Sequence, residues 1–267
     1  MARGIAKVKY ERQSGNVSVV DRPNWGFIYT TSLVKDAYWD IGDRVVLPDG
    51  REFRYGKSSS ALNTSEACHF ADTGLVAYTA AVIAAAIGDT SVIVPAATHT
   101  AVTKDELKGG YVVIFGSVAD GADMMFRGIL GNDASASAAA LTLYLDGPLD
   151  VAIDTSSAYE VYANPYGNLA HTTGAPSAGK IGPPAVYVSA ASMYFWVQVK
   201  GPMHQNPQST VIDNEGLGVN WRSDGSLDAV ATALGGLTIP NDSTTQYAGY
   251  RMVGDYDNNG PLIMLQG

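Results

Sequence analysis

The stretch over residues 194–202, YFWVQVKGP, constrains the fold more than any other part of the chain. Its residues alternate between an apolar set and an aromatic or polar set, namely Phe195, Val197 and Val199 against Tyr194, Trp196, Gln198 and Lys200. Side chains that alternate with a period of two point to opposite faces of a β-strand. We therefore expect a central strand with the apolar set inward. The Gly201-Pro202 pair is predicted to end it, because Pro cannot donate to a ladder.

Other short strands are predicted at spacings typical of a sandwich or barrel. Residues 45–47 and 52–55 flank a Pro-Asp-Gly turn and form a predicted hairpin. Four more runs cover residues 111–115, 124–130, 141–145 and 159–162. The Ala-rich residues 74–88 fit a helix or a buried strand, and the Gly and Thr around them favour extended structure. No βαβ alternation is present. The predicted class is all-β, an antiparallel, jelly-roll-like sandwich or barrel with an extended N-terminal arm and long loops.

The charge pattern separates the N-terminus from the rest. The chain has a formal net charge of −9, yet four of its 17 basic residues lie among the first twelve, namely Arg3, Lys7, Lys9 and Arg12. We expect an arm and lead-in over residues 1–40 and a β-rich domain over residues 41–267, with a subdivision near residue 203 left open. The four basic residues are the candidate assembly contacts, and a frayed tail is the alternative. Residues 164–184 are interpreted as a long ordered excursion that contacts neighbours.

Composition excludes several classes of function. A strongly acidic chain lacks the Lys and Arg needed for a non-specific grip on nucleic acid. The single cysteine, Cys68, excludes an internal disulfide framework and a multi-cysteine zinc site. The sequence shows neither a signal peptide nor a run of about 18 apolar residues that could span a membrane. We expect synthesis in a cytosol, with no nucleic-acid or membrane partner.

No motif with catalytic chemistry stands out. Residues 255–260 open like a calcium loop, but the twelfth position is Gln266 instead of a bidentate Glu, so an Asp- and Asn-rich turn is expected. Cys68-His69 is interpreted as a small buried Cys beside a polar His. The scattered acids are expected to cap turns, and a hydrolase with paired acids is an alternative; they are Asp120, Asp123, Asp146, Asp150 and Asp154. The sequence thus predicts no catalytic residue, metal or cofactor.

Four stretches together resemble virion structural proteins of tailed bacteriophages. They are VLPDGREFRYGKSSSALN, ELKGGYVVIFGSVADGADMMFRGILGN, LTLYLDGPLDVAIDTSSAYEVYANPYGNL and YFWVQVKGP. Their order and spacing are similar to those of particle proteins found beside capsid genes. The resemblance covers residues 42–202, leaves the first forty residues without a counterpart and carries no catalytic residues.

The resemblance implies a structural role, foremost capsid decoration or cementing that stabilises the head by protein–protein contacts. The implied partners are the major capsid protein and copies of the chain itself. Closed symmetry favours a homotrimer on the outer capsid surface. The alternative is a tail- or fibre-associated receptor- or carbohydrate-binding module, which would expose Tyr187, Tyr194 and Trp196 as a platform. Aromatic residues at strand spacing more often line a core, so core packing is expected for at least half of these three.

Overall fold

The computed structural model consists of antiparallel β-sheets, which confirms the predicted all-β class. It describes the backbone of residues 6–11, 17–22, 76–80 and 228–229, and backbone and side chains of residues 25–71, 83–95, 99–116, 124–137, 139–171, 179–205, 218–227, 246–253 and 261–267. The chain divides into two compact units. Unit 1 comprises residues 1–71 and 166–267, and unit 2 comprises residues 72–165.

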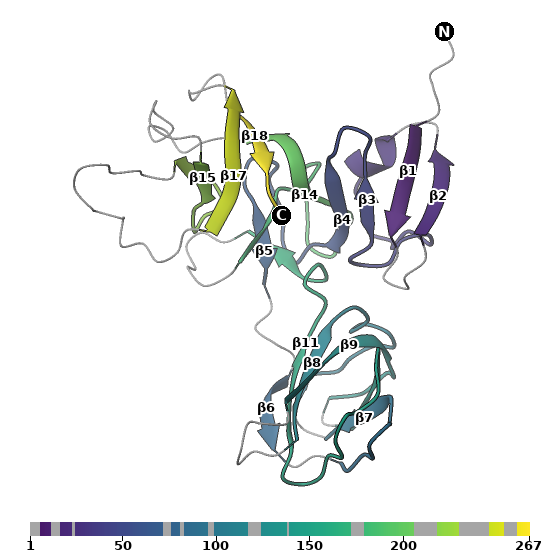
Figure 1. The fold of residues 1–267 in the computed structure, drawn as a ribbon. Coiled ribbons are helices and arrows are strands. Elements are labelled where there is room, and N and C mark those ends of the chain that lie inside the picture. The colour runs from purple at the N-terminus through teal and green to yellow at the C-terminus, as the bar shows by residue number, and fades with distance from the viewer. Residues whose placement is uncertain are drawn as a thin grey trace, which may run out of the picture. The chain divides into compact units, whose positions relative to one another are not determined.

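Unit 1 contains a nine-stranded and a three-stranded sheet (Figure 1). The larger has the order β16-β15-β17-β18-β14-β4-β3-β1-β2. Its strands are β1 (Ala6–Glu11), β2 (Val17–Arg22), β3 (Arg44–Val46), β4 (Glu52–Lys57), β14 (Tyr194–His204), β15 (Gly218–Trp221), β16 (Leu227–Ala229), β17 (Gln246–Val253) and β18 (Leu262–Leu265). The smaller, in the order β12-β5-β13, consists of β12 (Leu169–Ala170), β5 (Cys68–Phe70) and β13 (Lys180–Gly182). A short 3-10 helix, η1 (Gly26–Tyr29), lies between β2 and β3 in sequence.

Strand β14 is the middle strand of the larger sheet, as the sequence predicted. It pairs with β4 from Tyr194 to Lys200 and with β18 from Gly201 to His204. The prediction that Gly201-Pro202 ends the strand is wrong. Gly201 has φ 92°, a conformation that Gly adopts without strain, so the pair bends the strand at the point where its hydrogen-bonding partner changes.

Both faces of β14 are buried. Phe195 and Val197 have no exposed surface, which confirms the predicted inward set, and Val199 packs against the same cluster. The opposite face is also covered, since the indole of Trp196 lies edge-on to Trp39 with ring centroids 4.8 Å apart. Helix η1 and the segment that precedes β3 supply this second layer. A central strand between two cores explains the aromatic content of both parities.

The predicted hairpin is confirmed as β3 and β4, with Val45 opposite Phe53. Part of the predicted arm also belongs to the sheet. Strands β1 and β2 form an antiparallel hairpin, and β1 continues the ladder by pairing with β3. Backbone hydrogen bonds to β3 therefore hold residues 9–11, which the sequence had placed in an extended arm.

Unit 2 contains one curled six-stranded sheet in the order β6-β11-β8-β9-β10-β7 (Figure 1). Its strands are β6 (Val76–Ala80), β7 (Ser91–Val94), β8 (Tyr111–Phe115), β9 (Met124–Asn132), β10 (Leu141–Leu145) and β11 (Ala158–Tyr162). The four runs predicted here are confirmed, and β6 confirms extended structure in part of the Ala-rich segment. Aliphatic side chains of these strands and their connections form a core that belongs to unit 2 alone.

Unit 2 interrupts unit 1 between two neighbouring strands. Phe70 of β5 pairs with Leu169 of β12, and the backbone N–H of Ala71 donates to the carbonyl of Asn168 at 2.8 Å. The 164–184 segment, interpreted from sequence as an excursion, therefore contributes β12 and β13 to the small sheet. Strands β5 and β12 pair as neighbours, and the connection between them contains the whole of unit 2.

Candidate binding surfaces

The outward face of the sheet in unit 2 is apolar and exposed. On β9, Met125 and Ile129 point into the core, whereas Met124, Phe126 and Leu130 are 61%, 57% and 57% exposed. A polar residue is the usual occupant of such an outward position. We call this surface the apolar face, and it consists of Ile93, Tyr111, Val113, Phe115, Met124, Phe126, Leu130, Tyr144 and Tyr162.

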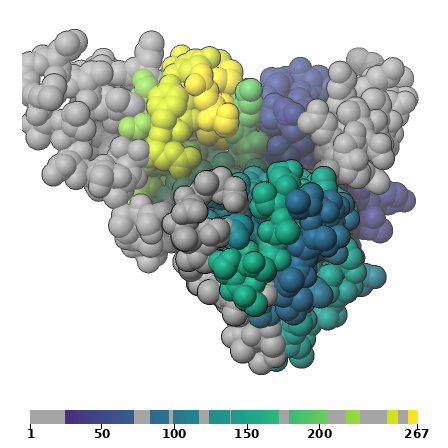
Figure 2. Space-filling model, turned by 60° about the horizontal axis from the view of Figure 1, so that its bottom comes forward, coloured from purple at the N-terminus to yellow at the C-terminus, as the bar shows by residue number. Residues whose placement is uncertain are grey.

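The strand register makes the apolar face continuous. Val113 lies opposite Phe126 and Phe115 lies opposite Met124 across the β8–β9 ladder. The rings of Tyr111 and Phe126 stack with centroids 5.1 Å apart and planes inclined by 18°. Strand β7 pairs with β10, and in Figure 2 blue and teal segments lie side by side on the visible surface of unit 2. Residues distant in sequence are therefore neighbours on this sheet. Contiguous exposed apolar surface of this kind marks interaction sites in soluble proteins.

Few charges interrupt this face. Among the described outward positions of the strands, Glu160 is the one charged residue, and it accepts a hydrogen bond from the hydroxyl of Tyr162 at 2.7 Å. The Tyr144 hydroxyl donates to Asp133 at the margin. These hydrogen bonds raise the pKa of Tyr162 and of Tyr144, so both hydroxyls stay protonated donors at neutral pH. The Asp146 carboxylate, which follows β10, lies against Gly128 of β9, so a second negative charge borders this face.

The sequence analysis did not identify the apolar face, although a signal for it exists. Residues 111–115 read YVVIF and residues 124–130 read MMFRGIL, so both parities of each strand are apolar. A strand with one face exposed to solvent should alternate between apolar and polar residues. Apolar residues at both parities, in a sheet whose described core cluster lies on one side, indicate a contact on the other side as well.

The structure places two of the four predicted assembly contacts, both near the edge of the large sheet of unit 1. Lys7 and Lys9 belong to β1, opposite Asp21 and Val19 of β2. Arg3 and Arg12 lie outside the described residues. The hairpin places two of the four basic residues on one strand, and their role as contacts stays a prediction.

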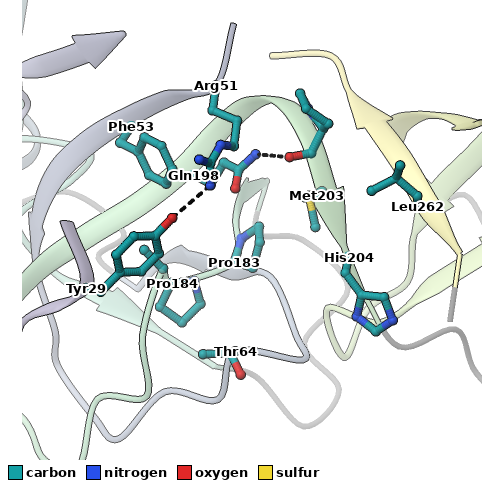
Figure 3. A pocket seen from close by; sticks show the side chains of 12 residues that line it. Tyr29, Arg51, Phe53, Thr64, Pro183, Pro184, Gln198, Met203, His204 and Leu262 are labelled. Carbon is teal, nitrogen blue, oxygen red and sulfur yellow. Dashed lines mark hydrogen bonds between the residues drawn. The ribbon is translucent and has the colours of Figure 1, made fainter. Parts of the chain in front are cut away.

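A small depression of about 270 Å³ lies where β14 changes partner (Figure 3). Three of its polar side chains, Tyr29, Arg51 and Gln198, are already committed to one another, to Asp49 or to the backbone, and Thr64 and His204 complete its polar lining. Arg51 donates from Nη1 to the Tyr29 hydroxyl at 2.8 Å and from Nε to Asp49, while Gln198 donates from Nε2 to the carbonyl of Pro202 at 2.9 Å. The rest of the lining is largely Pro, Met, Leu and Phe. This depression accompanies the bend of the strand and offers a ligand little polar recognition.

The residues weighed for catalysis have structural environments. Cys68 is fully buried, and its thiol donates to the carbonyl of Gly182 at 3.1 Å. Burial raises the pKa of Cys68 to about 12, so the reactive thiolate is absent at neutral pH. His69 is also buried, which confirms the interpretation of this pair.

The acidic residues that the structure describes act in turns and ion pairs. Asp154 caps a turn through Ser156, whose hydrogen bonds lower the pKa of Asp154, and Asp150 pairs with Arg127 at 2.6 Å. The described residues hold no cluster of three His, Cys, Asp or Glu side chains that could bind a metal. Asp120, Asp123 and the calcium-like residues 255–260 lie outside the described part of the chain.

The aromatic platform considered for sugar binding is not formed. Trp196 is 2% exposed, and Tyr194 stacks on Tyr55 with centroids 5.9 Å apart, whereas Tyr187 is exposed. Core packing of at least half of the three residues is thereby confirmed. In the described part of the chain, no helix is long and apolar enough to cross a membrane. Comparisons with protein-family models, curated proteins and solved structures found no match for this chain.

Proposed function

We propose that this chain is an assembly subunit that docks on another protein through the apolar face of unit 2. The observation that carries the proposal is the exposure of Met124, Phe126 and Leu130 on one sheet surface, beside Tyr111, Val113 and Phe115 of the neighbouring strand. Covering what is still exposed of each such side chain contributes about 1–2 kcal/mol. A partner with a matching apolar surface would remove this area from water, and this gain would stabilise the complex.

The resemblance to tailed-phage virion proteins supports a specific setting, a decoration or cement protein on the outer surface of the head. The partners are then the major capsid protein and copies of this chain, with a homotrimer favoured by closed symmetry. A net charge of −9 keeps free copies soluble and apart before they attach. Lys7 and Lys9, which would face an acidic neighbour, give the contact a charge component.

Binding to heads that lack this protein tests the proposal. Met124→Ser combined with Phe126→Ser should weaken attachment at least about 100-fold, because two exposed apolar anchors are lost. The matched control is Ile87→Ser in the same unit, which is 67% exposed but lies off the apolar face. Co-sedimentation measures attachment, and circular dichroism checks that each variant is folded. Equal attachment of the double variant and the control overturns the role of this face.

The role of Lys7 and Lys9 is better tested by substitution than by deletion of residues 1–12. Deletion would remove β1, which pairs with both β2 and β3, and would damage the sheet itself. Lys7→Glu with Lys9→Glu keeps the strand and should weaken attachment more at low salt than at high salt. If the charge-reversed variant attaches as well as the parent protein at every salt concentration, Lys7 and Lys9 are not contacts.

The place of the protein in the particle separates the two settings drawn from the sequence. Imaging of virions should show its density on heads. Density confined to tails, together with binding to a glycan array, would replace decoration by the receptor- or carbohydrate-binding alternative.

A further inference from the structure

A second pocket, of about 510 Å³, lies within unit 1 and differs in chemistry from the depression of Figure 3. Residues from β3, β4, β13, β14, β15, β17 and β18 line it. Its side chains include four cations, Arg44, Arg54, Lys180 and Lys200, and one carboxylate, Glu52. This excess of positive charge occurs in a chain whose net charge is −9. Such a local reversal of charge focuses anions towards the pocket.

The fold brings the cations together by register and by one bulge. Arg44 and Arg54 lie opposite each other across the β3–β4 ladder. In β14 the register shifts between Gln198 and Lys200, and Lys200 pairs with Glu52. An extra residue in a strand re-aims the side chains after it. Without the bulge, Lys200 would share the face of Gln198, where the sequence pattern had placed it.

The charges of the pocket are only partly neutralised. Glu52 accepts two hydrogen bonds from Arg44, at 2.9 Å and 2.5 Å, so this pair satisfies itself. Arg54 donates from Nη1 to the carbonyl of Gly42 at 2.9 Å and lies over the ring of Tyr166. Among the residues that the structure describes, Lys200 Nζ has no acceptor.

A buried lysine completes the charged lining. Lys180 is 7% exposed, and its ammonium donates to the carbonyl of Ser223 at 2.7 Å. The Gln246 amide holds the backbone of Lys180 through two hydrogen bonds, one from the Lys180 N–H and one to its carbonyl. These contacts fix Lys180 in a wall of the pocket, where desolvation lowers its pKa and the nearby Asp224 partly offsets that effect.

We propose that this pocket binds a small hydroxylated carboxylate, the chemical class of the sugar acids. Its volume lies within the 300–1,000 Å³ of sites for small organic ligands, which is too large for a lone inorganic ion. Arg54 and Lys200 supply donors for one carboxylate. Glu52 repels a second carboxylate, the Gln266 amide can bond to hydroxyl groups, and Ile181, Val199 and Leu265 offer apolar wall to a sugar ring. The inference goes beyond the proposed function and does not depend on it, since the docking face belongs to unit 2.

Calorimetric titration of the full chain tests the site with four probes: glucuronate, glucose, sulfate and hexaglutamate. Glucuronate should bind saturably and glucose at least about tenfold more weakly, because it lacks the carboxylate. Arg54→Gln and Lys200→Gln should each weaken glucuronate about tenfold or more. The matched control is Lys57→Gln, which removes a cation from the same strand as Arg54 but outside the pocket lining. Melting curves check that the variants are folded.

Each contrary result overturns the assignment in a defined way. Equal affinity for glucose and glucuronate removes the role of the cations, and equal affinity for sulfate reduces the pocket to a general anion site. Tighter binding of hexaglutamate makes it a site for an acidic peptide. If the two pocket variants bind glucuronate as well as Lys57→Gln does, the ligand lies elsewhere.

Discussion

At the scale of single residues, Val197 is the most sensitive position of the central strand. It has no exposed surface and packs in a cluster with Phe195 and Leu169. Val197→Asp places an unpaired charge there and should lower the free energy of unfolding of unit 1 by several kcal/mol. Val34→Asp, at a position 75% exposed, is the control and should change it by less than about 0.5 kcal/mol. Denaturant titration measures both, and a stable Val197→Asp variant would contradict the assignment of this core.

Cys68 should make stability depend on pH in the alkaline range. Burial raises its pKa from 9.0 to about 12, so the unfolded chain loses this proton at lower pH than the folded chain does. The contribution of the thiol is complete below pH 9 and is lost as the pH rises towards about 12. Cys68→Ala should therefore flatten the fall in unfolding free energy between pH 9 and 11. An unchanged slope would show that the thiol is not responsible.

At the scale of elements, two costs of replacing Gly201 in the bend of β14 can be distinguished: the cost of a positive φ and the cost of a steric clash. A Cβ at Gly201 would lie 2.8 Å from the carbonyl oxygen of Gly50 and from Cα of Arg51, and φ is 92°. Gly50 has a similar φ of 86° but open space around it. Gly50→Ala should thus cost about 1 kcal/mol from φ alone, and Gly201→Ala clearly more, because the backbones must also separate. Equal decreases in thermal stability for the two variants would show that β14 and the β3–β4 turn can move apart without a further cost.

The elements predicted from sequence are those whose signals are local. The β3–β4 hairpin follows from a Pro-Asp-Gly turn, and the strands of unit 2 follow from apolar runs between turn residues. The partner change at Gly201 and the bulge at Val199 depend on β18 and β4, which are distant from β14 in sequence, so no local pattern predicts them. Residues 164–184 were misread for the same reason, because their strands pair with β5.

The binding surfaces were harder to predict than the fold. Alternation shows which residues share a face, but only the finished sheet shows that Phe126 on that face is 57% exposed among the described residues. The basic pocket has no sequence signature at all, since its cations come from four separate strands. The basic charge of the first twelve residues was visible in the sequence, but the β1–β2 hairpin that contains Lys7 and Lys9 was not predicted.

At the scale of the whole molecule, two units with separate cores should unfold in two transitions. Leu143→Ala, at a fully buried position of unit 2, should lower one transition, and Val197→Asp should lower the other. A fragment of residues 72–165 should unfold at the temperature of the transition that Leu143→Ala shifts. Calorimetry distinguishes this result from a single transition that both substitutions move together.

The position of unit 2 between β5 and β12 sets an order of folding during synthesis. Unit 2 is one continuous segment, so all its strands are synthesised about 100 residues before the last strand of unit 1. Once folded, it holds Val76 opposite Val161, near the two ends of its own segment. Strands β5 and β12, separated by almost a hundred residues, then meet as if a short loop joined them. The inserted unit removes most of the loop-closure entropy that their pairing would otherwise cost.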